Sequence, residues 1–118
     1  MEKELIDLYV ENRPWGKFER YVKNKKCTVK ILYVNLNSRT SLQMHENRDE
    51  FWKVLEGFAQ VELGDRVFSA SKGDIIQISK NLKHRVSTED SPCVIMEISL
   101  GDFDEKDIVR LEDDYDRS

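Results

Sequence analysis

Two histidines and a glutamate stand at spacings that suit a metal site. His45 and Glu50 lie five residues apart, and His84, the only other histidine of the chain, follows a Gly-Asp turn and a short apolar run. Neutral imidazole nitrogens and a carboxylate oxygen are ligands of first-row divalent metals, and three such ligands leave positions for water or substrate. The three residues predict a site for a divalent metal ion, and zinc, manganese, iron or nickel would fit.

Two amide side chains near the first histidine are expected to add a weaker ligand. The alternation of polar and apolar residues puts Gln43, His45 and Asn47 on one face of a strand. An amide oxygen is a weaker donor than an imidazole nitrogen, so Gln43 or Asn47 is the predicted fourth ligand. Glu50 opens the next strand, which lets its carboxylate meet His45 from there.

Short segments with an apolar residue at every second position dominate the chain, and they predict an all-β fold. The pair Gly64-Asp65 suits the positive φ angles of a two-residue hairpin. Many short strands with almost no helical periodicity favour a sandwich or a barrel. A short helix is predicted only near residues 105–110, before a polar tail. The predicted strands cover residues 17–22, 28–36, 41–45, 51–56, 59–63, 66–69, 75–78, 83–87 and 93–99.

Length and charge limit the class of protein. The 118 residues predict one domain, residues 1–118. Nineteen Lys and Arg against twenty-three Asp and Glu give a net charge of −4, which argues against a protein that coats nucleic acid or an anionic membrane. No apolar run approaches the about 20 residues of a membrane span, and the first residues lack the basic and apolar regions of a secretory signal. We therefore expect a cytoplasmic protein with no nucleic-acid or membrane partner.

The spacing of these residues resembles the two motifs of the cupin family. The match is carried by His45, Glu50, Gly57, Gly73 and His84. Three positions depart from the family pattern: Asn47 stands where the second histidine is expected, and Ser79 and Asn81 replace a proline and a glycine. The resemblance implies a double-stranded β-helix, in which two antiparallel sheets pack as a jelly roll. It also implies a homodimer formed through the N-terminal strands, for which Trp15 and Phe18 supply apolar surface.

A narrower resemblance extends over nearly the whole chain. It is carried by Arg13-Pro-Trp-Gly-Lys-Phe, Leu42-Gln-Met-His, Arg48-Asp-Glu-Phe-Trp, His84-Arg85, Glu97-Ile-Ser-Leu-Gly and Asp107-Ile-Val-Arg110. These segments are similar to type II mannose-6-phosphate isomerase, in which this domain usually follows a mannose-1-phosphate guanylyltransferase. No Gly-rich nucleotide signature precedes residue 13, so we expect the isomerase part to stand alone.

The isomerase resemblance implies that the chain interconverts mannose 6-phosphate and fructose 6-phosphate. A sugar phosphate needs charge-assisted donors, which arginine supplies well. The implied phosphate ligands are Arg13, Arg48, Arg85 and Arg110. Glu97, at the end of the last predicted strand, is either a paired structural carboxylate or the acid/base of the reaction, and a metal-bound water is the other candidate base.

Two other functions are compatible with the sequence. A non-catalytic cupin that binds a sugar or a sugar nucleotide would account for the departures at Asn47, Ser79 and Asn81. A non-haem iron oxygenase shares the ligand set of two histidines and one carboxylate, but nothing else in the chain points to it. Metal analysis separates the binding module from the enzymes, and oxygen consumption identifies an oxygenase.

Overall fold

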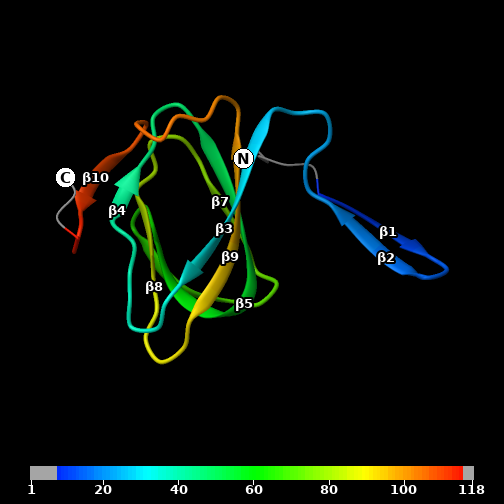
Figure 1. Ribbon diagram of the computed structural model, residues 1–118, viewed down its shortest axis with the longest axis horizontal. Coiled ribbons are helices and arrows are strands. Elements are labelled where there is room, and N and C mark those ends of the chain that lie inside the picture. The colour runs from blue at the N-terminus through cyan, green and yellow to red at the C-terminus, as the bar shows by residue number, and fades with distance from the viewer. Residues whose placement is uncertain (1–7, 116–118) are drawn as a thin grey trace.

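Antiparallel strands build the whole of the computed structural model, which describes residues 8–115 (Figure 1). The strands are β1 (Tyr9–Arg13), β2 (Gly16–Arg20), β3 (Cys27–Val34), β4 (Leu42–Met44), β5 (Asp49–Leu63), β6 (Arg66–Ser71), β7 (Ile75–Ile78), β8 (His84–Ser87), β9 (Cys93–Leu100) and β10 (Val109–Glu112). Within residues 8–115 there is no helix long and apolar enough to span a bilayer.

The long strand β5 belongs to both layers of the barrel. Its first part pairs with β7 on one side and β9 on the other, and β3 lies beyond β9. Its last part pairs with β6 and β8, and β4 and β10 continue that layer. Gly57 lies where β5 passes from one layer to the other, with a φ of +76°. A Cβ atom there would lie 2.3 Å from the Pro92 carbonyl oxygen, so the bend requires glycine.

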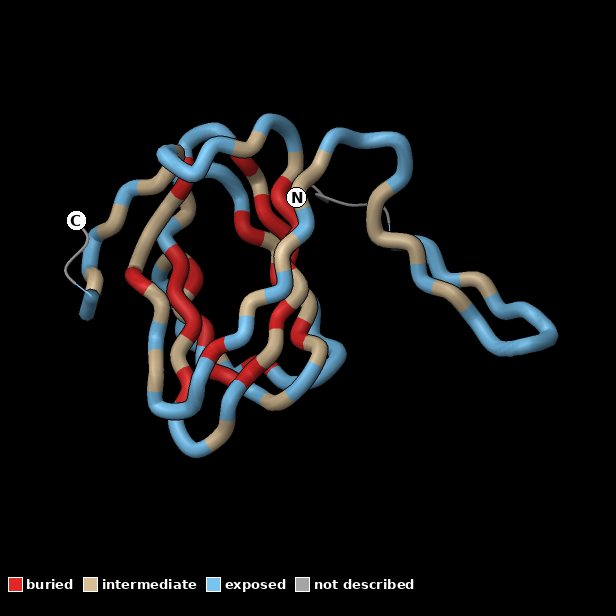
Figure 2. The backbone as a smooth tube through the Cα atoms, viewed as in Figure 1, coloured by how far each residue is buried: buried red, intermediate tan, exposed pale blue. Residues whose placement is uncertain are grey.

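Apolar side chains from both layers fill one part of the barrel, and Figure 2 shows buried positions along the strands of the barrel. The period-two pattern places alternate residues of each strand inside, which is why short apolar segments suffice to build this core. The buried core residues are Val34, Trp52, Val54, Ala59, Val61, Leu63, Ala70, Ile76, Ile78, Val86, Cys93 and Ile95.

The hairpin β1–β2 projects from the barrel (Figure 1). Its two strands pair with each other and with no other strand of residues 8–115. Its base contacts the outer face of the first layer, where Lys53 donates to the Tyr21 hydroxyl at 2.5 Å and the Tyr21 and Phe51 rings pack together. Trp15, in its turn, is 73% exposed.

The predicted all-β jelly roll is confirmed, including the Gly64-Asp65 hairpin turn between Leu63 and Arg66. Two predicted strands, residues 51–56 and 59–63, are one strand, β5. The predicted helix near residues 105–110 is wrong: residues 105 and 106 form a turn, and β10 begins at Val109. The free edge of β4 supplies the hydrogen-bonding partner that draws this segment into an extended conformation. Strand β1 was not predicted, because its polar residues do not alternate with apolar ones.

Candidate metal centre and cavity

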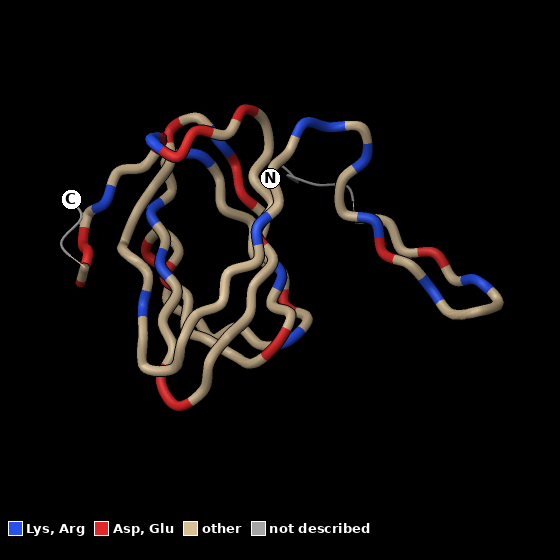
Figure 3. Tube along the Cα trace, in the orientation of Figure 1, with Lys and Arg blue, Asp and Glu red and all other residues tan. Residues whose placement is uncertain are grey.

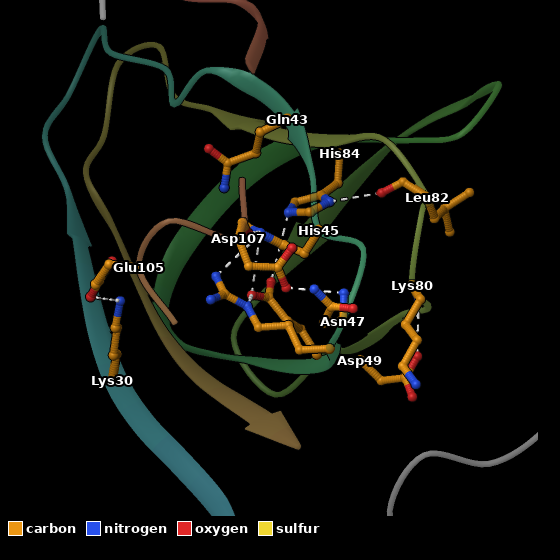
Figure 4. Close-up of polar contacts among 12 residues, drawn as sticks. Lys30, Gln43, His45, Asn47, Asp49, Lys80, Leu82, His84, Glu105 and Asp107 are labelled. Carbon is orange, nitrogen blue, oxygen red and sulfur yellow. Dashed lines mark hydrogen bonds and ion pairs between the residues drawn. The ribbon is translucent and has the colours of Figure 1, made fainter. Parts of the chain in front are cut away.

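Three side chains from different parts of the sequence meet in the barrel. His45 follows β4, Glu50 lies at the start of β5, and His84 is the first residue of β8. Their candidate ligand atoms lie within 4.8 Å of one another, and all three residues are buried. Figure 4 shows the two imidazole rings close together, with a centroid separation of 5.2 Å. The structure therefore brings the three predicted metal ligands to one point.

Backbone carbonyl groups set the tautomer of both histidines. The Nδ1 atom of His45 is 2.6 Å from the Asp107 carbonyl oxygen, and that of His84 is 3.0 Å from the Leu82 carbonyl oxygen. A carbonyl only accepts, so each Nδ1 carries the proton and each Nε2 offers a lone pair. Burial lowers the pKa of His45, and it lowers the pKa of His84 to about 4. Both rings are therefore neutral at pH 7, the form that binds a metal.

Two buried atoms at the meeting point have no hydrogen-bond partner among the described residues. They are Oε1 of Glu50 and Nε2 of His84, which lie 3.7 Å apart. An unpaired buried carboxylate oxygen or imidazole nitrogen is costly. A cation between them would satisfy both atoms, and two imidazoles with one carboxylate suit a first-row divalent ion. The residues present therefore fit a divalent metal.

Arg48 already places one positive charge beside this group. Its Nε atom donates to Oε2 of Glu50 at 2.9 Å, and its Nη2 atom lies 3.3 Å from Nε2 of His45. The guanidinium also stacks on the Phe103 ring, 4.4 Å from its centroid. Only 6% of Arg48 is exposed, so this ion pair is held in a region that excludes water.

Glu97, on β9, stands next to Glu50. Burial raises the pKa of Glu97 to about 7, and the charge of the Glu50 carboxylate and hydrogen bonding with it act in the same direction. Its strand neighbours are Trp52 on β5 and Lys30 on β3. A carboxyl group that titrates near neutral pH can both take up and release a proton under physiological conditions.

A cavity of about 770 Å³ adjoins this group and is lined by His45, Arg48 and Glu97 among others. Its wall is formed by β3 on one side and by residues of β4, β10 and the segments beside them on the other. Figure 3 shows that acidic and basic positions crowd the loops at one rim of the barrel. The charged and amide side chains among the lining residues, together with the one imidazole, are Lys30, Asn35, Arg39, Gln43, His45, Arg48, Glu97, Glu105 and Arg110. A small anionic ligand in this cavity would meet positively charged hydrogen-bond donors on several sides.

The two predicted amide ligands are placed differently. Gln43 lines the cavity, and its Oε1 atom accepts a hydrogen bond from the Ser41 hydroxyl at 2.6 Å. Asn47 is exposed in the loop before β5, and the cavity lining does not include it. Its backbone amide donates to the Asp107 carboxylate at 3.0 Å. Only Gln43 of the two therefore lies at the cavity.

The four predicted phosphate ligands are also divided. Arg48 and Arg110 line the cavity. Arg85 is buried outside the lining, where it donates to the Glu112 carboxylate and to the Thr40 carbonyl oxygen, both at 2.9 Å. Arg13 pairs with its neighbour Glu11 on the projecting hairpin. The cavity of this chain thus collects two of the four arginines.

Asp107 is a positioning residue that the sequence analysis did not single out. Its carbonyl group orients His45, and its carboxylate accepts the backbone amides of Glu46 and Asn47 at 2.9 and 3.0 Å. These contacts fix the loop between β4 and β5, to which His45 belongs. Asp107 belongs to the Asp107-Ile-Val-Arg110 segment of the family resemblance, and this was the sequence signal that could have identified it as a positioning residue.

The fold is that of the cupins. A cupin protein from Bacteroides fragilis superposes with a TM-score of 0.59 over 66% of this chain and 70% of that chain, at 18% sequence identity. At this identity the likeness concerns the fold alone. Buried histidines and a carboxylate inside a jelly-roll barrel are consistent with that class.

The chain belongs to the family described as "Mannose-6-phosphate isomerase C-terminal", which matches residues 2–113. It is 36% identical over 108 residues to the alginate biosynthesis protein AlgA of Pseudomonas aeruginosa. It is 34% identical over 105 residues to mannose-1-phosphate guanylyltransferase 2 of Escherichia coli O157:H7. The matches cover 90% and 87% of this chain but only 22% of each relative, so the chain spans under a quarter of their length. The predicted family resemblance is confirmed.

Proposed function

We propose that this domain interconverts mannose 6-phosphate and fructose 6-phosphate, with no guanylyltransferase domain required. The observation that carries the proposal is the buried group of His45, Glu50 and His84 under a cavity that also contains Glu97. The family to which the chain belongs names this isomerase. The reaction uses a sugar phosphate found inside cells, and we propose the cytoplasm as its location.

The reaction moves one proton between C2 of the aldose and C1 of the ketose through an enediol, and a second proton between O2 and O1. Glu97 is the proposed acid/base, because a pKa of about 7 lets it accept the proton from one carbon and return it to the other. A zinc, manganese, iron or nickel ion bound by His45, Glu50 and His84 would supply positive charge for the oxygen atoms of the enediolate. Gln43 is the proposed additional ligand because it lines the same cavity.

The phosphate group requires cationic donors at a distance from the reacting carbons. Arg110 on β10 lines the cavity, and we propose that it binds the phosphate. Arg48 is the second candidate. Arg85 and Arg13 remain predictions of the resemblance, and a role for either in phosphate binding requires a rearrangement or a second chain.

The alternative is a cupin that binds a sugar or sugar nucleotide without converting it. The exposed position of Asn47 favours this alternative, because an amide at the surface leaves fewer ligands for the metal than the family pattern provides. The two functions differ in turnover, so an activity measurement decides between them.

We also propose that the chain acts as a homodimer. The edge strand β3 turns Val29, Ile31 and Tyr33 outward, and these residues are 55%, 40% and 76% exposed. The projecting hairpin presents Trp15, also exposed, and an isolated two-stranded hairpin is only marginally stable in water. A second copy brings both an apolar face and a hairpin, so the two surfaces can cover each other in a symmetric pair.

The decisive experiment incubates the purified chain with each sugar phosphate in deuterated water and follows both sugars by NMR. We expect interconversion with deuterium entering the sugar, loss of activity on chelation and recovery with a divalent ion. Glu97→Gln should lower kcat by about 10² to 10⁴. The matched variant Glu105→Gln changes a more exposed carboxylate of the same cavity and should retain activity. Tight sugar binding without turnover under every metal condition would favour the binding module.

A further inference from the structure

The Nε2 atom of His45 has one lone pair, and Arg48 already uses it. The proton of this ring is on Nδ1, because the Asp107 carbonyl oxygen at 2.6 Å can only accept. Arginine can only donate, so the 3.3 Å contact between its Nη2 atom and Nε2 is a hydrogen bond from Arg48 to His45. A metal ion would need the same lone pair. His45 therefore cannot bind a metal ion through Nε2 while Nε2 accepts the hydrogen bond from Arg48.

The second contact of Arg48 adds a charge effect. Its Nε atom donates to Oε2 of Glu50 at 2.9 Å, so the guanidinium neutralises the carboxylate that would otherwise attract a metal ion. The other carboxylate oxygen, Oε1, faces His84 and has no hydrogen-bond partner among the described residues. A metal can therefore bind Oε1 of Glu50 and Nε2 of His84 without displacing Arg48, whereas His45 must first release Arg48.

The Arg48 guanidinium can interact with a ligand in the cavity instead of with His45. It lines the cavity, and its stacking on Phe103 keeps the guanidinium plane beside the space where a sugar phosphate is proposed to lie. An N–H group released from His45 would be buried and unpaired unless an acceptor in the cavity took it. An anionic ligand supplies that acceptor.

We propose that Arg48 is an internal competitor of the metal for His45, and that an anion in the cavity relieves this competition by taking the released guanidinium donor. Metal and sugar phosphate then bind cooperatively, and Arg48 carries part of the coupling between them. The competition rests on the proposed metal ligands, and the cooperativity rests on the proposed sugar-phosphate substrate.

The test measures zinc affinity by competition with a chelating dye, for the wild-type chain, Arg48→Met, Arg48→Lys and Arg85→Met. Arg85 is the matched control, because it is a buried arginine paired with a glutamate, and its guanidinium contacts Thr40 and Glu112 rather than the proposed ligands. We expect Arg48→Met to bind zinc about tenfold more tightly or better, since one hydrogen bond to a charged group no longer competes. Arg48→Lys, which keeps the charge but not the planar fork, should show a smaller gain, and Arg85→Met none. Arg48→Lys also decides the question if Arg48→Met does not fold.

The opposite sign would overturn the competition. If Arg48 only orients Glu50 for the metal, its removal weakens zinc binding, as loss of an outer hydrogen bond usually does. If the wild-type chain binds no zinc, or His84→Ala retains it, the proposed metal site itself is wrong.

The cooperativity is tested by repeating the titration with mannose 6-phosphate present. We expect the sugar phosphate to tighten zinc binding more in the wild-type chain than in Arg48→Met. Equal tightening in both would overturn the role of Arg48 in the coupling. Failure of mannose 6-phosphate to bind at all, measured by calorimetry, would overturn both the cooperativity and the proposed substrate, while the zinc comparison still decides the competition.

Discussion

Replacing Glu97 with glutamine should change how the stability of the metal-free protein depends on pH. In the folded chain, burial and the neighbouring Glu50 raise the pKa of Glu97 to about 7, from an ordinary value of 4.5. Between these two pH values the folded state keeps a proton that the unfolded state has released. The stability contributed by this proton is complete below pH 4.5 and is lost as the pH rises through 7.

The size of the effect follows from the shift. About 2.5 pKa units correspond to about 3 kcal/mol of unfolding free energy, because one unit is worth 1.36 kcal/mol. Only 6% of Glu97 is exposed, so little of this is screened by solvent. The low pKa of His84 acts in the opposite direction, with stability lost as the pH falls through 4. The wild-type chain and Glu97→Gln both keep His84, so most of its contribution cancels in the difference between them.

The assay is urea denaturation in the presence of a chelator at pH 4.5 and pH 8. Relative to the wild-type chain, Glu97→Gln should gain about 3 kcal/mol of unfolding free energy between the two pH values, because glutamine has no proton to lose. Glu105→Gln, which changes an exposed carboxylate, should show the same difference from wild type at both pH values. A change below about 1 kcal/mol for Glu97→Gln would refute the raised pKa and with it the case for Glu97 as an acid/base.

Four further predictions concern the metal, the substrate, the fold and the assembly. His84→Ala should abolish stoichiometric zinc binding in the dye competition assay while the circular dichroism spectrum stays that of a β protein; one retained zinc per chain would disprove the site. Arg110→Ala should raise the KM for mannose 6-phosphate about tenfold in steady-state kinetics, because a charge-assisted hydrogen bond is worth about 1.5–3 kcal/mol, and an unchanged KM would exclude it as a phosphate ligand. Gly57→Ala should lower the unfolding free energy by about 2–4 kcal/mol in urea, because its Cβ atom would overlap a backbone carbonyl oxygen, and a neutral result would show that the bend can relax. Tyr33→Glu should give a monomer by light scattering. Val67→Glu, which also replaces an exposed hydrophobic residue but lies on β6, should leave the dimer intact, and a monomeric wild-type chain would disprove the assembly proposal.

The class of fold could be predicted from the residue pattern alone, because strand formation in a jelly roll requires mainly that alternate residues be apolar. This local pattern predicted β7 with its observed bounds and the turn at Gly64-Asp65. Segments whose conformation depends on a distant partner were not predictable in this way. β10 is extended because it pairs with the edge strand β4. Nothing in the local sequence of residues 105–110 indicates that this edge is available for pairing.

The candidate ligands His45, Glu50 and His84 were identified from residue type and spacing, since a metal site restricts both. The surroundings of these ligands depend on the tertiary structure. It placed Arg48 against two of the ligands, turned Arg85 away from the cavity and put Asn47 at the surface. It also brought Glu97 next to Glu50, although they lie 47 residues apart in the chain. A pKa, a lone pair already in use and the direction of a guanidinium are set by neighbours that only the folded barrel assembles, so the spacing of residues in the sequence cannot determine them.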